Sequence, residues 1–287
     1  LSGERVLRGD SLHLSGLRRV FDPLHVRDDC RFNRQLIVLA FTNRSGSTYL
    51  GQLLASAPDL TGFREDLNHN IAARRVADAG LSGLTSYLHH IAGADTPELA
   101  GFGLKASAEQ LRLIQMTGID RSFCGTTIIR IRRRDRVAQA VSLWVAWQTR
   151  QWTSRQHARS ATLTYDYFAL RKQLAALQEA EGAMDLALSV LPYPLLSVEY
   201  ETLCDKTESM LSAIRAGLGL PPTDMQPSSW TERQASEEKT ELVARFRADL
   251  SKDWSLKAIE IGRDRKTELG SSEYPSNGGH AENPWRK

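Results

Sequence analysis

The sequence has few cysteines and no arrangement of them that would suggest a disulfide framework or a metal site. Its 287 residues include three cysteines, Cys30, Cys124 and Cys204, which are widely spaced and form no CxxC pair. Three cysteines cannot all pair within one chain, so we expect reduced thiols and a cytoplasmic setting. His89 and His90 are adjacent, so they cannot share a helix face, and no further cysteine or histidine stands at ligand spacing. We therefore predict no bound metal ion.

Long apolar runs and a strong excess of one charge are also missing. No apolar run approaches the roughly 20 residues that a membrane-spanning helix needs, so we predict no membrane span. The 37 basic and 34 acidic residues give a net charge of +3, which suits an anionic ligand but gives little support for nucleic-acid binding. The length and ordinary composition favour one large globular domain or two small ones.

The most informative stretch is LIVLAFTNRSGSTYLGQLL, residues 36–54. Its first seven residues form an apolar run typical of a strand buried on both faces, and residues 49–54 continue with helical spacing. Backbone N–H groups at the start of a helix lack partners and favour anions, of which phosphate is the commonest. The residues between strand and helix therefore predict an anion site in which Gly46 permits close approach, hydroxyls donate and arginine adds charge; they are Arg44, Ser45, Gly46, Ser47 and Thr48.

Two alternatives to this interpretation follow from the same stretch. A strand, a Ser/Gly turn and a helix occur in many α/β proteins and often bind no ligand. The ATPase pattern GxxxxGK[ST] is absent, because no glycine lies five residues before Gly46 and no lysine follows it. The β- and γ-phosphates of a nucleoside triphosphate are therefore a poor match, although a nucleotide kinase or hydrolase stays an alternative.

Strands alternate with helices along the rest of the chain, which predicts an α/β fold with a central parallel sheet covered by helices on both faces. Strands are expected at residues 36–42, 101–106, 126–131 and 194–200. Residues 58–62 are interpreted as a loop. Helices are expected at residues 70–92 with a break near Gly80 and Gly83, 111–116, after Asp135, 166–190 with a break near Gly182, 207–218 and 236–250.

A cluster of arginines at the end of strand 126–131 predicts a second anion site. The cluster consists of Arg130, Arg132, Arg133, Arg134 and Arg136. Ser142 follows Arg133 by nine residues and Arg134 by eight, so either arginine could bind a phosphate together with this serine. Arginine clusters are more often a solvated rim. Here, however, both sites should lie at the carboxyl edge of one sheet, which suggests a nucleoside ligand with phosphates at both ends.

Four pieces of sequence resemble the sulfotransferases that use 3′-phosphoadenosine-5′-phosphosulfate (PAPS), and most closely the bacterial Stf-zero family. They are NRSGSTYL at 43–50, RRDRVAQAVSLWVAWQTRQW at 133–152, VEYETL at 198–203 and ERQAS at 232–236. The resemblance implies a single P-loop-like sulfotransferase domain at residues 35–255. It leaves an N-terminal extension at 1–34, expected over the domain surface, and a C-terminal segment with a disordered tail at 256–287. It also implies a homodimer.

The same resemblance implies a role for each matching position. The Arg44–Thr48 turn should hold the 5′-phosphosulfate of PAPS, with Arg44 also acting in catalysis, and Arg133 or Arg134 with Ser142 should hold the 3′-phosphate. Glu65, 21 residues after Arg44, matches the catalytic carboxylate that takes the acceptor proton. The remaining nucleotide-binding residues that the family implies are Arg233 and Gln234.

The acceptor is the least determined part of this prediction. A carbohydrate or glycolipid hydroxyl is expected, but residues 66–107, which should contribute acceptor contacts, show little resemblance to the family. Lys105 stands at a predicted strand end and could place an ammonium group near the leaving oxygen. A non-catalytic nucleotide-binding member of the fold stays a further alternative.

Overall fold

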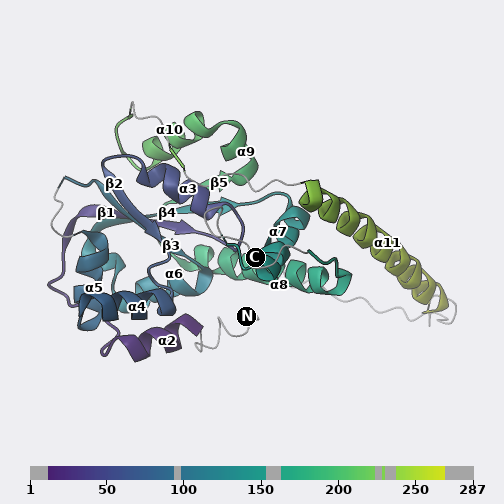
Figure 1. Cartoon of the computed structure of the whole chain (residues 1–287), viewed down its shortest axis with the longest axis horizontal. Coiled ribbons are helices and arrows are strands. Elements are labelled where there is room, and N and C mark those ends of the chain that lie inside the picture. Colours follow the sequence, from purple (N-terminus) through teal and green to yellow (C-terminus); the bar gives the residue numbers. More distant parts are fainter. Residues whose placement is uncertain (1–11, 94–97, 153–162, 224–227, 230–236, 269–287) are drawn as a thin grey trace, which may run out of the picture. The chain divides into compact units, whose positions relative to one another are not determined.

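The computed structural model describes residues 12–93, 98–152, 163–223, 228–229 and 237–268, and within them five strands form one parallel sheet (Figure 1). Its order is β2-β3-β1-β4-β5, and every neighbouring pair is parallel. The strands are β1 (Phe32–Ala40), β2 (Leu60–Arg64), β3 (Gly101–Ala106), β4 (Phe123–Arg132) and β5 (Leu195–Glu199). The predicted fold class, a central parallel sheet flanked by helices, is confirmed.

The central strand β1 is apolar from Leu36 to Ala40 because this part contributes to a hydrophobic core on each face of the sheet. Leu36 and Val38 belong to one core, whereas Ile37 and Leu39 belong to the other. Successive side chains of a strand point to opposite faces, so a strand buried on both sides reads as a continuous apolar run. This arrangement accounts for the unbroken pattern of residues 36–40 and places the loop that follows at the middle of the sheet edge.

Helices cover both faces of this sheet (Figure 1). The first core includes α2 (Leu12–Val20), α4 (His69–Ala79), α5 (Gly83–Ala92), α6 (Ala108–Thr117) and α8 (Tyr167–Val190). The second includes α3 (Ser47–Ala55), α9 (Tyr200–Asp205) and α10 (Thr207–Gly217). The remaining helices are α7 (Arg136–Thr149), which packs on α8, and α11 (Glu237–Glu268).

Local signals account for several of the helix ends. Asp135 caps α7 by accepting a hydrogen bond from the Ala138 backbone N–H at 2.9 Å, as expected for an aspartate before a helix. Ser107 and Gln110 form a capping box at the start of α6. Gly80 adopts a left-handed conformation and ends α4, which confirms the predicted break between two helices.

Three expectations about local structure were wrong. The segment 58–62 is not only loop, because β2 begins at Leu60; the strand is short, lies at the sheet edge and contains a register shift, so its pattern is weak. Gly182 does not break α8, since buried Glu181 and Met184 hold that part of the helix against the sheet. Residues 12–34 do not merely cover the surface, because Leu17 and other side chains of this segment lie within the first core.

The chain separates into two compact units, residues 1–243 and 244–287. The first contains the whole sheet, and the described part of the second is helical. The expected domain limits at residues 35 and 255 stay predictions.

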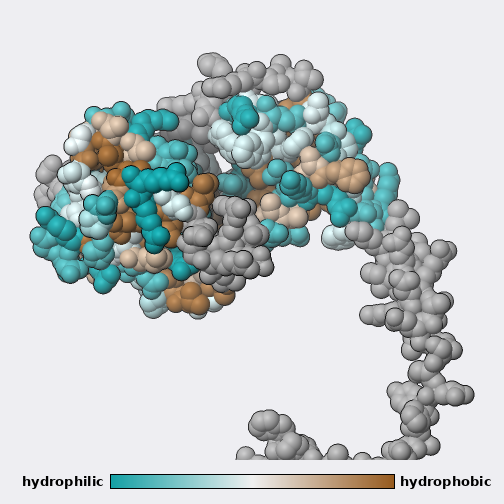
Figure 2. Space-filling view, turned by 90° about the horizontal axis from the view of Figure 1, so that it is seen from below, coloured by the Kyte–Doolittle hydropathy of each residue, from teal (hydrophilic) through white to brown (hydrophobic). Residues whose placement is uncertain are grey.

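Among the described residues no helix is both long and apolar enough to cross a bilayer, and the face in Figure 2 mixes hydrophilic with hydrophobic residues.

Helix α2 is attached to the domain through a partly buried polar cluster. The carboxylate of Glu109 accepts hydrogen bonds from the backbone N–H groups of His13 and Leu14, and so caps the start of α2. The Nδ1 atoms of His13 and His69 are 3.0 Å apart, so one of the two rings must donate to the other. Gly16 lies against the His69 ring, where an added Cβ would be 2.4 Å from Cγ.

This cluster predicts a pH-dependent stability. Burial, aided by His69, lowers the pKa of His13 from its ordinary value of 6.5, while Glu109 and Glu65 act in the opposite direction. Below that value the unfolded chain binds a proton that the folded chain does not, so the free energy of unfolding falls as the pH decreases. His13→Asn keeps an acceptor for His69 and should show a smaller loss in urea unfolding between about pH 7.5 and about pH 5.5.

The slope of the free energy of unfolding against pH should differ between the wild type and His13→Asn by no more than about 1.4 kcal/mol per pH unit, the limit for one proton. The exposed His90 provides the control, since His90→Asn should follow the wild-type curve. Parallel curves for the wild type and His13→Asn would contradict the expectation.

Candidate active site

The loop between β1 and α3 has a backbone suited to binding an anion. Arg44 and Gly46 both adopt left-handed conformations, with φ of 63° and 95°, on either side of Ser45. Alternation of this kind turns successive N–H groups to one side and forms a concave anion site. The Ser45 side chain is fully buried, and its Oγ has no hydrogen-bond partner among the described residues. The loop therefore contains a buried hydroxyl that could form a hydrogen bond with a ligand.

Arg44 joins this loop to α7. Its Nε donates to Ser142 Oγ at 3.0 Å, and a terminal nitrogen donates to the backbone oxygen of Trp152 at 2.6 Å. Burial lowers the pKa of Arg44 from its ordinary value, and the nearby charge of Arg133 acts in the same direction. The two anion sites predicted from separate stretches are therefore connected by a direct contact between Arg44 and Ser142.

Arg133 and Arg134 point to different environments. Arg133 lies with its guanidinium 5.2 Å from the ring centre of Tyr200, its side chain is 20% exposed, and its buried Nε has no hydrogen-bond partner in the described part of the chain. The Arg134 side chain is 69% exposed and pairs with Glu199 at 3.4 Å. Arg133 is thus the arginine that shares a buried environment with Arg44.

The other three arginines of the cluster are paired with carboxylates of α8. Arg130 and Arg136 each donate to Glu181, at 2.9 and 2.8 Å, and Arg132 Nε lies 3.4 Å from the same carboxylate. Arg130 also pairs with Asp185 at 2.6 Å. Sequence reasoning did not identify Glu181, because a glutamate within a long helix carries no distinguishing local pattern.

Lys105 lies between Glu65 and Thr48 and donates a hydrogen bond to each of them. The ammonium group of Lys105 donates to Glu65 Oε1 at 2.8 Å and to Thr48 Oγ1 at 3.1 Å, and it lies 4.7 Å from the ring centre of Phe41. The lysine side chain is 5% exposed and that of Glu65 38%. Parallel pairing of β3 with both β1 and β2 brings these residues to the same edge of the sheet.

Two residues of the predicted site cannot be placed in the structure. Arg233 and Gln234 are outside the described residues.

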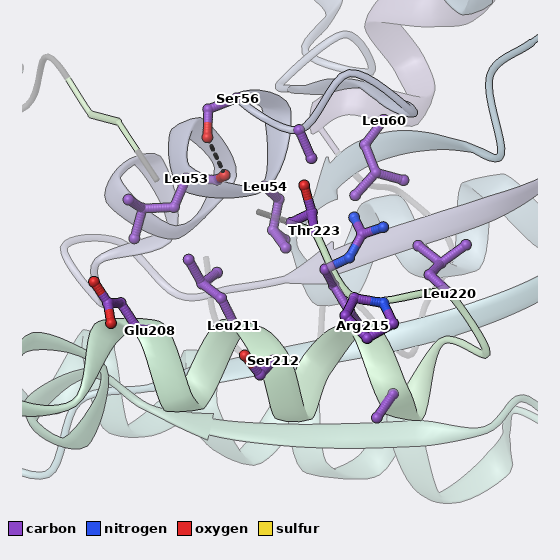
Figure 3. Close-up of a pocket in the computed structure, with 13 residues that line it drawn as sticks. Leu53, Leu54, Ser56, Leu60, Glu208, Leu211, Ser212, Arg215, Leu220 and Thr223 are labelled. Atoms are coloured by element: carbon purple, nitrogen blue, oxygen red, sulfur yellow. Dashed lines mark hydrogen bonds between the residues drawn. The ribbon is translucent and has the colours of Figure 1, made fainter. Parts of the chain in front are cut away.

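A cavity of about 410 Å³ separates the last turns of α3 from α10, and its lining includes Leu53, Leu211 and the buried Arg215, but none of the predicted site residues (Figure 3). Within the described ranges no group of three or more His, Cys, Asp or Glu side chains could hold a metal ion.

The sequence model of the Stf0 sulphotransferase family matches residues 101–249, just over half of the chain. The chain belongs to the Stf0 sulphotransferase family. The matched segment contains Lys105, Arg133 and Ser142, whereas the anion loop and Glu65 precede it. The family membership predicted from four short pieces is thereby confirmed.

A curated relative of this Stf0 chain is trehalose 2-sulfotransferase from Mycolicibacterium smegmatis (strain ATCC 700084 / mc(2)155). It is 29% identical over 160 residues, which cover 55% of this chain and 56% of the relative, so the chain spans about half the length of the curated relative it matches. Among solved structures, the sulfotransferase domain from the curacin biosynthetic pathway is similar at 15% identity and a TM-score of 0.45, covering 73% of this chain and 82% of that one. Mouse sulfotransferase SULT7A1 complexed with PAP is similar at 15% identity and a TM-score of 0.40, covering 78% and 67%.

The packing of the anion loop predicts that Gly46 tolerates no side chain. A Cβ at this position would lie 2.2 Å from the Tyr200 ring, in addition to the cost of its positive φ. Gly46→Ala should therefore reduce the free energy of unfolding by about 2 kcal/mol or more, measured by urea titration.

Gly80→Ala is the matched control, because Gly80 also has a positive φ but an added Cβ would meet nothing within 4 Å. It should lose only the backbone contribution, about 1 kcal/mol. Equal losses in the two variants would show that the Tyr200 contact has no energetic role.

Proposed function

We propose that this chain transfers a sulfuryl group from PAPS to a hydroxyl group of a carbohydrate or glycolipid. The observation that carries the proposal is the double contact of Lys105, which links Glu65 to Thr48 of the anion loop. A general base must lie next to the group that is transferred, and this contact brings the candidate base to the donor end of the site. Membership of the Stf0 sulphotransferase family supports the reaction class.

Two unpartnered buried atoms fit a donor with a phosphate at each end. Ser45 Oγ and Arg133 Nε are both buried without a hydrogen-bond partner among the described residues, which is costly unless a ligand supplies one. In the proposal the loop from Arg44 to Thr48 binds the 5′-phosphosulfate, and Arg133 with Ser142 binds the 3′-phosphate. Each arginine lies near a carboxylate, Arg133 near Glu201 and Arg134 near Glu199, and Arg133 is preferred because its side chain is far less exposed.

The chemistry assigns a separate task to each polar side chain. When bound, PAPS supplies a sulfuryl group attached to its 5′-phosphate. That phosphate is the leaving group, and negative charge develops on it during transfer. Glu65 accepts the proton of the acceptor hydroxyl as that oxygen attacks. Lys105 and Arg44, together with the N–H groups of the loop, hold positive charge where the negative charge develops. Positioning and electrostatics then provide most of the catalysis, as in phosphoryl transfer.

The acceptor class rests on the name of the curated relative, trehalose 2-sulfotransferase, and not on a defined acceptor pocket. We extend it only to carbohydrate hydroxyl groups, including those of glycolipids. A homodimer is proposed on the same ground of family resemblance. An acceptor screen that starts from trehalose, with radiolabelled PAPS as donor, tests the substrate class, and light scattering tests the dimer.

The proposed base predicts a selective loss of rate in Glu65→Gln. The amide oxygen can still accept the hydrogen bond from Lys105 but cannot take a proton, so kcat should fall by about 100-fold or more. The affinity for adenosine 3′,5′-bisphosphate should change by less than about two-fold, because the nucleotide contacts are retained. Transfer of radiolabelled sulfate to the best acceptor of the screen measures the first quantity, and calorimetry measures the second.

Glu179→Gln provides the control, since it makes the same change at an exposed position of α8. It should retain both the rate and the affinity of the wild type. Unaltered kcat in Glu65→Gln would remove Glu65 as the base and favour a non-catalytic role for this carboxylate.

The different environments of Arg133 and Arg134 predict that their alanine variants differ in affinity for the nucleotide. Arg133→Ala should weaken binding of adenosine 3′,5′-bisphosphate by about 10- to 100-fold, because a charged hydrogen bond to the 3′-phosphate is lost. Arg134→Ala should have less than about a two-fold effect, since this exposed side chain makes only a surface ion pair. Calorimetric titration of both variants distinguishes the assignments, and the reverse ranking would transfer the 3′-phosphate role to Arg134.

A further inference from the structure

A single carboxylate of α8 meets the start of the anion loop from inside the domain. Glu181 is 7% exposed, and its Oε1 accepts a hydrogen bond from Thr42 Oγ1 at 2.6 Å. Its Oε2 accepts from Arg130 at 2.9 Å and from Arg136 at 2.8 Å. Glu181 therefore contacts the end of β4, the first residue of α7 and the loop after β1, which are the elements that carry both anion sites.

Gln139 completes this network from α7. Its Nε2 donates to Thr42 Oγ1 at 3.1 Å and to the backbone oxygen of Asn43 at 2.7 Å. Its Oε1 accepts from Arg136 at 2.9 Å. The two residues that precede Arg44 are thus held by side chains of α7 and α8.

The direction of the hydrogen bonds at Thr42 follows from the charge on Glu181. Burial by itself would raise the pKa of Glu181, but hydrogen bonds from Arg136 and Thr42 and the charge of Arg130 hold it below its ordinary value. The carboxylate is therefore ionised and can only accept, so the Thr42 hydroxyl donates to it and accepts from Gln139. These two hydrogen bonds fix the direction of the Thr42 hydroxyl group.

A fixed Thr42 matters because the next residues adopt an uncommon backbone conformation. Arg44 has a φ of 63°, which is unfavourable for a residue with a side chain and persists where surrounding contacts determine it. The Ser45 N–H donates to the Thr42 backbone oxygen at 3.2 Å, and the N–H groups of Gly46 to Thr48 can bind an anion only if this conformation is kept. Contacts that hold the loop entrance therefore set the geometry of the proposed donor site without touching the donor.

We propose that Glu181 is a positioning residue, which holds the anion loop in its binding conformation through Thr42 and aligns α7 with it through Arg136. The link to PAPS affinity rests on the function proposed above, whereas the effect on the loop does not. Asp185 lies one turn further along α8 and pairs with two of the three arginines of Glu181, Arg130 and Arg132. Among the described residues it has no hydrogen bond or ion pair with the anion loop. It therefore offers a comparison in which a carboxylate on shared arginines is neutralised at a more exposed position, with a side-chain exposure of 54% against 9% for Glu181.

Backbone hydrogen–deuterium exchange tests the effect on the loop in the full chain without any ligand. Glu181→Gln should raise the exchange rate of amides in residues 43–48 by about ten-fold, because the loop loses a charge-assisted hydrogen bond. Thr42→Val should do the same, whereas Thr42→Ser and Asp185→Asn should match the wild type. Unchanged exchange in Glu181→Gln, or an equal increase in Asp185→Asn, would overturn the proposal.

Affinity for adenosine 3′,5′-bisphosphate tests the consequence for the donor site. Glu181→Gln and Thr42→Val should each weaken binding by about ten-fold, and the double variant should be no weaker than Glu181→Gln, in which the contact with Thr42 is already impaired. A purely structural Glu181 would lower Tm and leave the affinity unchanged, and additive losses would show that it does not act through Thr42. If the wild type itself fails to bind, the proposed function fails, while the exchange measurement still decides the role of Glu181.

Discussion

The position of β1 between β3 and β4 is the constraint on which the rest of the structure depends. Because β1 is paired in parallel on both sides, the loops that follow these three strands emerge at one edge of the sheet. Helix α3 packs in one core and α6 in the other, so the chain leaves β1 and β3 toward opposite faces. The polar residues after each strand are left at the edge between them, where a ligand can bind.

At that edge most of the clustered arginines form ion pairs with carboxylates, which reduces the positive charge available to an anion. Arg130 and Arg136 bind Glu181, and Arg134 lies beside Glu199. Buried charges are stable only when paired, so these contacts allow arginines to be concentrated near the loop without strong mutual repulsion. Arg133 is the most weakly paired of these arginines. Its Nε lies 4.0 Å from the carboxylate of Glu201 and, although buried, has no hydrogen-bond partner among the described residues.

Membership of the Stf0 sulphotransferase family and the geometry of this edge support the proposed reaction from different directions. The family match begins at residue 101 and therefore covers Lys105 and the Arg133–Ser142 pair. The loop from Arg44 to Thr48 and the carboxylate of Glu65 lie outside it, and they join the matched part through side-chain contacts of Lys105 and Arg44. The candidate site is thus assembled from a segment within the family match and a segment before it.

The sequence by itself determined the fold class, and it predicted the anion loop and a phosphate site formed by Arg133 or Arg134 with Ser142, because strand periodicity, turn chemistry and helix capping are local. Only the tertiary structure showed that Arg133 is less exposed than Arg134, attached Arg44 to a serine 98 residues away and brought Glu181 to Thr42 across 139 residues. Contacts of this kind depend on how strands and helices pack, and no periodicity along the chain records them. For the same reason β2, a short edge strand with a register shift, was missed.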